Sequence, residues 1–290
     1  MNAHRFARLL KCRFFLISDG FLKIPKSNAN MKLVELSSPK IGAISRSTPV
    51  VIPIAAIEQH GDHLPVWTDS LLLGEIVERM EKSLGKQILV APLLWLGNSD
   101  HHLDFFGTLS ASSRTYLDVL NDLVENLLSY GFKRIVLLNG HGGNDVPAKQ
   151  ALFEVRQRHR IRKDLLLLLA TYWGLGTEPW KVDPTIEQRD MGHACEWETS
   201  MVLALRPDLV GDFGNAPIIE PGSAFRPASR AWTTKDRSSI GHIGWPHLAS
   251  KEKGEVLLTA FSNDVERWLN GVIDWDGSSW EGTKQFGFPV

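Results

Sequence analysis

Four short stretches of the 290-residue chain carry histidines at positions suited to binding a metal ion. In the segment IEQHGDHLPVWTD, Glu58 and His60 lie two residues apart, so on an extended chain both side chains point to one face. Asp69 ends this segment, at the expected start of a helix. A carboxylate, an imidazole and a second carboxylate predict half of a divalent-metal site. The alternative for Asp69 is a helix N-cap alone, because Asp is favoured there.

Two further segments add candidate donors. In NGHGGN, glycines on both sides of His141 let the backbone fold tightly. This loop could instead cradle a phosphate, although the lysine of a P-loop is missing. GHACEWETS contains His193, Glu196 and Glu198. Residues i and i+2 of a helix point apart, so we expect only one of the two glutamates at a shared site. The alternative for both glutamates is a solvated helix charge.

The fourth segment, GNSDHHLDFFGTLS, contains Ser99, His101 and His102. Six of the ten histidines lie in these four segments, which makes a common site the economical interpretation. We expect His63 and His102 to be structural rather than ligands.

Other catalytic chemistries explain fewer of these residues. The chain has no G-x-S-x-G elbow and no G-x-G-x-x-G after a predicted strand. Cys195 as a thiol nucleophile has only His193 in support. Paired carboxylates of a glycosidase would leave the histidines without a role. A metal-assisted hydrolase uses all of them.

The elements that must position these segments alternate between strand and helix. Continuous apolar, β-branched runs predict buried strands, and apolar residues at helical spacing predict helices. The predicted strands are 49–57, 86–94, 133–138 and 165–171, and the predicted helices are 70–84, 112–130, 145–159, 196–205 and 255–268. This alternation indicates βαβ units and an α/β fold whose parallel sheet is covered on both faces. We expect the four segments to meet at one rim of that sheet.

Composition is that of an ordinary soluble globular protein, with 43% hydrophobic and 22% charged residues. A formal net charge of -1 argues against nucleic-acid binding, and no apolar run reaches the roughly 18 residues of a membrane span. Two cysteines exclude a disulfide framework and favour the cytoplasm. We expect a single domain over residues 31–290, with long loops at 206–249 and 270–290.

Residues 1–30 are basic and patchily hydrophobic, with Asp19 as their one acidic residue. Three interpretations stay open: a targeting segment, a peripheral amphipathic helix, and an extension upstream of a start at Met31. A secretory signal is disfavoured, because Arg13 interrupts the apolar stretch and no small-residue cleavage site follows. We predict that this extension is dispensable or disordered.

These segments, in the order in which they follow one another along the chain, resemble the creatininase family of creatinine amidohydrolase-like proteins. Five motifs typical of that family, among them E-x-H-G-x-H-L-P-x-x-T-D and N-G-H-G-G-N, are matched by residues 58–69, 107–110, 131–144, 193–200 and 241–254. The resemblance implies a three-layer α/β/α fold with a mostly parallel central sheet. It also implies one or two divalent metal ions per subunit, hydrolysis of an amide-type C–N bond in a small molecule, and a homo-oligomer, commonly a hexamer.

The resemblance also assigns roles to single residues. The metal ligands that it implies are Glu58, His60, Asp69 as a bridge, and His141. In creatinine-hydrolysing members, a glutamate two residues after the loop histidine also binds metal. Here that residue is Gly143, and the implied fifth ligand is Glu198. His193 matches a family histidine near the substrate and is the implied proton shuttle. Zinc, manganese and iron all suit such a nitrogen and oxygen donor set.

Gly143 argues against creatinine itself as the substrate. The family also includes formamidopyrimidine-type deformylases and a peptidase that trims a ribosomally made precursor, and both stay open as alternatives. Ser99, Trp173 and Trp180 are expected at the substrate pocket, although Trp is as often plain packing. A catalytically silent, structural member is the other class of hypothesis, which the full ligand set disfavours.

Deletion of residues 1–30 should leave fold and activity intact, because the family resemblance begins at about Met31. Thermal melting and an activity assay of the truncated chain test this. A large drop in melting temperature would show instead that the segment packs on the core.

Overall fold

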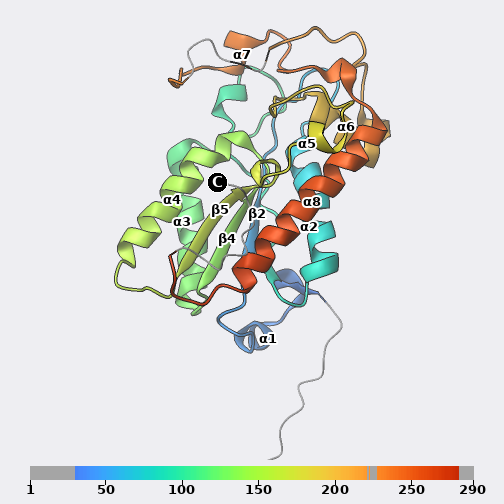
Figure 1. Ribbon diagram of the computed structural model, residues 1–290. Coiled ribbons are helices and arrows are strands. Elements are labelled where there is room, and N and C mark those ends of the chain that lie inside the picture. The colour runs from blue at the N-terminus through green and yellow to red at the C-terminus, as the bar shows by residue number, and fades with distance from the viewer. Residues whose placement is uncertain (1–29, 221, 223–226, 281–290) are drawn as a thin grey trace, which may run out of the picture.

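The computed structural model describes residues 30–220, 222 and 227–280 of the chain (Figure 1). At its centre lies a parallel sheet of five strands in the order β1-β3-β2-β4-β5. The strands are β1 (Met31–Lys32), β2 (Val50–Ile54), β3 (Leu89–Val90), β4 (Arg134–Asn139) and β5 (Leu166–Thr171). Except for Asn30, the N-terminal extension considered above lies outside the described residues.

Helices cover both faces of this sheet, which gives three layers (Figure 1). One face carries α2 (Thr68–Leu84), α6 (Glu196–Leu205) and α8 (Lys251–Ile273), and the other carries α3 (Ser113–Ser129) and α4 (Asp145–Arg158). Three short helices complete the set: α1 (Ser38–Gly42), α5 (Pro179–Val182) and α7 (Thr234–Arg237). The expected three-layer α/β/α fold is therefore confirmed.

The strands read as continuous apolar runs because both of their faces are buried. Along β4, Val136 and Leu138 join the core under α2, α6 and α8, while Ile135 and Leu137 join the core under α3 and α4. Alternate side chains of one strand thus supply two separate cores. A polar residue in the middle of such a strand would be buried on either side.

Several elements differ from the sequence prediction. The strand predicted over 86–94 ends at Val90 in the structure. The N–H groups of Leu89 and Ala91 donate to β2, but the next bond comes from Leu94 rather than Leu93, so one extra residue interrupts the ladder before the single bridge from Ile54 to Leu94. Strand β1 was not predicted, since two residues show no pattern. Helix α8 is longer than 255–268 at both ends and takes part of the predicted loop at 270–290. The loop predicted at 206–249 contains α7.

The order of the strands creates a crevice where the candidate donors lie. Strands β2 and β4 are hydrogen-bonded neighbours, yet the chain leaves β2 for α2 on one face and β4 for α4 on the other. Loops at such a switch point diverge at the carboxyl ends of the strands and leave room between them for a ligand. The histidine segments after β2 and β4 both open into this crevice.

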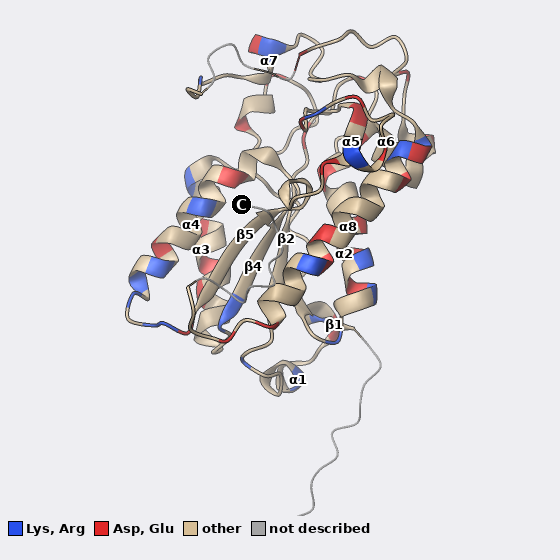
Figure 2. Cartoon of the chain, viewed as in Figure 1, with Lys and Arg blue, Asp and Glu red and all other residues tan. Residues whose placement is uncertain are grey.

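Charged residues of both signs are mixed along the helices that Figure 2 shows. This agrees with the near-balance of acidic and basic residues in the sequence. None of the helices in the described part of the chain has the length and hydropathy of a membrane span.

Candidate metal centre

The loop after β2 holds His60 in one orientation. Its Nδ1–H donates to the carbonyl of Glu58 at 3.0 Å, so Nε2 faces the other way. That nitrogen lies 3.2 Å from Asp69 Oδ1 and 3.7 Å from Glu198 Oε1. An imidazole whose second nitrogen is fixed by a backbone carbonyl is the usual arrangement of a metal-binding histidine.

His141, after β4, is oriented in the same way. Its Nε2–H donates to the carbonyl of Asn98 at 3.0 Å, and its Nδ1 lies 3.0 Å from Asp69 Oδ2 and 3.3 Å from Glu58 Oε1. The side chain of Asn139 clamps the turn, since it accepts from the His141 N–H at 3.1 Å and donates to the His141 carbonyl at 2.8 Å. The glycine-rich loop thus directs Nδ1 of His141 into the crevice. This suits a metal ligand rather than a phosphate cradle, which would present a row of backbone N–H groups.

Asp69 lies between these two imidazoles, with one carboxylate oxygen toward each. The N-cap residue of α2 is Trp67, and Asp69 lies within the first turn with only 4% of its surface exposed. The alternative role of Asp69 as an N-cap is therefore wrong. Its position is that of a residue that could bridge two cations.

The first turn of α6 brings Glu198 to the same place. Before this helix, Ala194 adopts a left-handed backbone conformation (φ 49°), which is uncommon for a residue other than glycine. Nε2–H of His63 lies 3.1 Å from the Ala194 carbonyl and 3.0 Å from the Thr199 hydroxyl, and so holds this strained turn. His63 is structural, as expected.

Glu196 points away from the site, as its spacing from Glu198 predicts. It accepts backbone N–H bonds from Glu187 and Gln188 and pairs with Lys253 Nζ at 2.6 Å. Both glutamates are nearly or fully buried, so their alternative interpretation as solvated charges is wrong.

The donors at the centre lack partners of their own. Among the described residues, buried side-chain atoms without any hydrogen bond include Glu58 Oε2, His60 Nε2, Asp69 Oδ2 and Glu198 Oε2. Buried polar atoms are normally satisfied, so a cluster of orphans marks a place for a cation. Oxygen and imidazole nitrogen donors suit zinc, manganese or iron. The residues present therefore fit a divalent metal.

The pKa values point to the same deficit of positive charge. Burial opposes a charge on His60 and His141, but the carboxylates around them raise the pKa of both imidazoles well above the ordinary value. Burial likewise opposes ionisation of Asp69, yet the two imidazoles hold its pKa well below the usual range. The three carboxylates thus draw in protons, which a metal ion would replace.

Three more histidines border the centre. Nδ1 of His193 lies 3.5 Å from Glu58 Oε1, and Nε2 of His102 lies 3.3 Å from the same oxygen. His101 also has a ring nitrogen within reach of a group formed with Glu58 and His141. Burial, followed by the charge of His60, lowers the pKa of His193 to about 3, so this imidazole is neutral at pH 7. The sequence signal that could have identified His101 and His102 as neighbours of the centre is that they are two adjacent histidines in one segment.

A cavity of about 890 Å³ opens over these residues. Trp173 lines it, as expected, together with Trp232 and Arg237 from the segment around α7, which the sequence did not single out. Ser99 is fully buried, and its hydroxyl lies 3.2 Å from Nε2 of His141, behind the centre. Trp180 packs on Trp197, with ring centroids 6.4 Å apart, in the core under α8.

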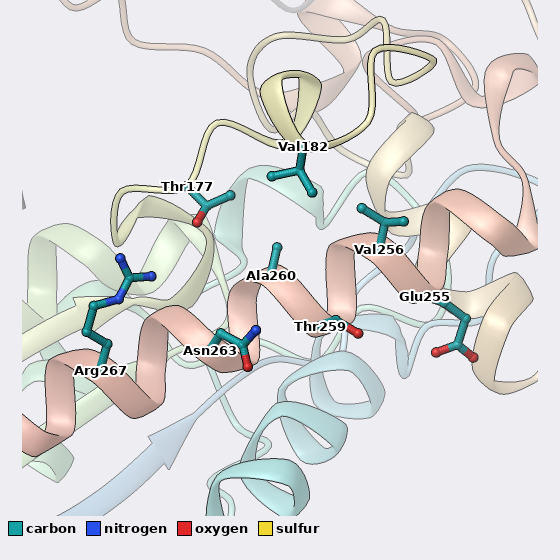
Figure 3. Close-up of a pocket in the computed structure, with 8 residues that line it drawn as sticks. All are labelled: Thr177, Val182, Glu255, Val256, Thr259, Ala260, Asn263 and Arg267. Carbon is teal, nitrogen blue, oxygen red and sulfur yellow. The ribbon is translucent and has the colours of Figure 1, made fainter.

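A second cavity, of about 480 Å³, lies along the outer side of α8 (Figure 3). Its described lining offers one carboxylate, Glu255, and one guanidinium, Arg267, but no histidine or cysteine. This set of side chains could not hold a transition metal.

The sequence model of one family, described as "Creatininase: Creatinine amidohydrolase", matches residues 34–269 of this chain. The chain belongs to the creatininase family. The resemblance inferred from the motifs is thereby confirmed, and members of this family are hydrolases.

Curated creatininase relatives have diverse names. The chain is 28% identical to creatinine amidohydrolase of Pseudomonas putida, over 72% of this chain and 84% of that protein. It is 29% identical to the mycofactocin precursor peptide peptidase of Mycolicibacterium smegmatis, over 77% of this chain and 88% of that protein. The family thus includes both a small-molecule amidohydrolase and a peptidase at similar distance.

Solved creatininase structures share the fold. A crystal structure of creatinine amidohydrolase has a TM-score of 0.69 and 26% identity, covering 82% of this chain and 95% of that one. Further structures of the same likeness include a Zn-Zn type of a creatininase mutant and one named creatininase Mn.

Conservative substitutions should separate metal binding from structural support. Asp69→Asn and Glu198→Gln keep the shape but remove a negative charge, so we expect folded proteins that lose metal and most activity. Glu196→Gln should keep its metal and lose stability instead, on the order of 1–3 kcal/mol, because Lys253 loses its charged partner.

Elemental analysis beside melting curves of the three variants is the measurement. Full metal occupancy in Asp69→Asn would rule out a bridging role and leave the histidines as the basis of the site.

Proposed function

We propose that this protein is a divalent-metal-dependent amidohydrolase that cleaves an amide-type C–N bond of a small molecule. The observation that carries the proposal is the convergence of five buried donors, four of which have an oxygen or nitrogen without a hydrogen-bond partner. A catalytically silent member would have no reason to keep these costly unpartnered groups. Family membership supports hydrolysis as the reaction class.

The proposed ligands divide into two sets that share Asp69. In the first set, Nδ1 of His141 lies 3.0 Å from Asp69 Oδ2 and 3.3 Å from Glu58 Oε1. In the second set, Nε2 of His60 lies 3.2 Å from Asp69 Oδ1 and 3.7 Å from Glu198 Oε1. This arrangement supports one or two zinc, manganese or iron ions per subunit. When bound, such an ion polarises a carbonyl and lowers the pKa of a water molecule to near 7.

His193 is the proposed proton shuttle. Its Nε2–H donates to the carbonyl of Gln59 at 2.6 Å, which leaves the Nδ1 lone pair directed toward the centre. A neutral imidazole of this kind can accept a proton from the attacking water and then donate it to the leaving nitrogen. The left-handed turn at Ala194 sets the distance between this imidazole and Glu198.

The structure around Gly143 supports a substrate other than creatinine. A Cβ atom at this position would overlap the carbonyl oxygen of Asn98 and crowd the His141 ring. A glutamate of the kind found in creatinine-hydrolysing members therefore has no room in this backbone. A formamide or another small amide is the favoured substrate class.

A second candidate function is trimming of a peptide. The cavity of about 890 Å³ lies near the upper end of the range for drug-sized ligands, roughly 300–1,000 Å³, and exceeds what creatinine needs. Relatives named mycofactocin precursor peptide peptidase support this alternative.

Removal of metal should abolish hydrolysis, and zinc or manganese should restore it. We expect activity on a panel of formamides, cyclic amides and short peptides, with weak or no turnover of creatinine. The measurement is product release by chelator-treated and reloaded protein. Full activity of metal-free protein would end the proposal, and creatinine turnover at 1–10³ per second, the usual range of enzymes, would contradict the substrate argument.

We further propose that the protein self-associates through an apolar surface near the centre. The loops at 65–67 and 103–109 carry large exposed apolar side chains: Val66, Trp67, Leu103, Phe106 and Leu109. The two loops are adjacent, since a Cβ at Gly107 would touch Val66. An apolar patch of this kind is typical of a protein interface.

Phe106→Glu should dissociate this assembly into monomers of 32.5 kDa, because it places a charge in the apolar contact. Light scattering after size exclusion measures the mass. The matched control is Phe153→Glu, which changes another exposed phenylalanine, on α4. A monomeric parent protein, or an assembly that survives Phe106→Glu, would refute this role.

A further inference from the structure

We propose that Gln59 is a positioning residue that sets the tautomers of two histidines at the centre, His102 and His193. Gln59 lies between the proposed ligands Glu58 and His60, and only 5% of its surface is exposed. The inference adds to the proposed function, but it stands on hydrogen bonds that exist without a metal ion.

The orientation of the Gln59 amide is determined by two backbone groups. The N–H of Gly61 donates to its Oε1 at 2.9 Å, so this atom is the oxygen. Its Nε2 donates to the carbonyl of Gly241 at 3.0 Å. Gly241 has a positive φ of 94°, and a Cβ there would overlap Gln59 Oε1. The amide therefore has one hydrogen left to donate.

His193 cannot accept that hydrogen. Its Nε2 lies 2.6 Å from the main-chain carbonyl of Gln59, which can only accept, so Nε2 carries a hydrogen. The 3.1 Å contact between Gln59 Nε2 and His193 Nε2 thus joins two donors. The main chain of Gln59 fixes His193 with its Nδ1 lone pair toward the cavity.

His102 is the acceptor that remains. Its Nδ1 lies 2.7 Å from Gln59 Nε2 and 2.9 Å from the hydroxyl of Thr234, which is fully buried in α7. An imidazole that accepts at Nδ1 carries its hydrogen at Nε2. That nitrogen lies 3.3 Å from Glu58 Oε1 and is placed to donate to it.

The Gln59 residue therefore gives different roles to the neighbouring imidazoles of His102 and His193. His102 becomes a donor that orients Glu58 and stays out of the ligand set, while His193 keeps a lone pair for proton transfer. Without the Gln59 amide, His102 could place its hydrogen on Nδ1 and turn a bare Nε2 toward Glu58. It would then compete as a ligand, and Glu58 would lose an orienting bond.

The test replaces Gln59 without changing its size. Gln59→Glu removes the donor and adds a charge, and Gln59→Met removes the donor without one. Protein labelled with ¹⁵N-histidine reports each tautomer by its ring-nitrogen shifts, and a His102→Asn variant assigns the signals. In the parent protein, we expect His102 with hydrogen on Nε2 in both metal-free and zinc-loaded forms. In the two variants, we expect hydrogen on Nδ1, or on both nitrogens in Gln59→Glu.

Gln188→Glu is the matched control. Gln188 is equally buried, and its side chain likewise donates to one backbone carbonyl, that of Asp190, and accepts from one backbone N–H, that of Trp245. We expect a similar loss of melting temperature and no change in the histidine spectra. Zinc affinity, measured by chelator competition, should fall by about 10–100-fold in the Gln59 variants alone, the usual effect of removing a bond behind a ligand.

Two results would overturn the inference: hydrogen on Nδ1 of His102 in the parent protein, or unchanged spectra in both Gln59 variants. A parent protein that binds no zinc would instead refute the proposed function, and the spectra of the metal-free protein would still decide the role of Gln59.

Discussion

Three carboxylates buried within reach of one another are the constraint on which the rest of this protein depends. Glu58, Asp69 and Glu198 have 1%, 4% and 6% of their surface exposed, and they come from three different elements. Their mutual repulsion in a medium of low dielectric opposes folding unless positive charge lies among them. The histidines, the clamp at Asn139 and the turn at Ala194 all serve to bring and hold such charge at this place.

The general plan of the fold was predictable from the sequence, because parallel strands buried on both faces appear as continuous apolar runs. The run that became β2 is apolar at every position, since each face meets a different core. The end of β3 was not predictable in the same way. Apolar residues continue to Leu94, and the extra residue between the N–H bonds of Ala91 and Leu94 to β2 leaves no pattern in the sequence.

The candidate site was predictable in its donors and not in their surroundings. Glu58, His60, Asp69, His141 and Glu198 stand in motifs whose spacing carries meaning along the chain. His102 and Gln59 act through contacts with Gly241 and Thr234, more than a hundred residues away, which no local pattern records. Ser99 and Trp180 have suitable chemistry for a substrate pocket, yet packing places the first behind His141 and the second in the core.

The pairing of β2 with β4 has a consequence for the order of events during folding. Val50 and Ile135 are partners in this ladder, and the donors beyond it come from residues as far apart as 58 and 198. Contacts between such distant segments form late, after loop closure has been paid for. The proposed metal centre is therefore complete only once the sheet has assembled. An ion bound at that centre would stabilise the folded protein by mass action, and the metal available to the folded protein, rather than to the growing chain, would determine which ion is held.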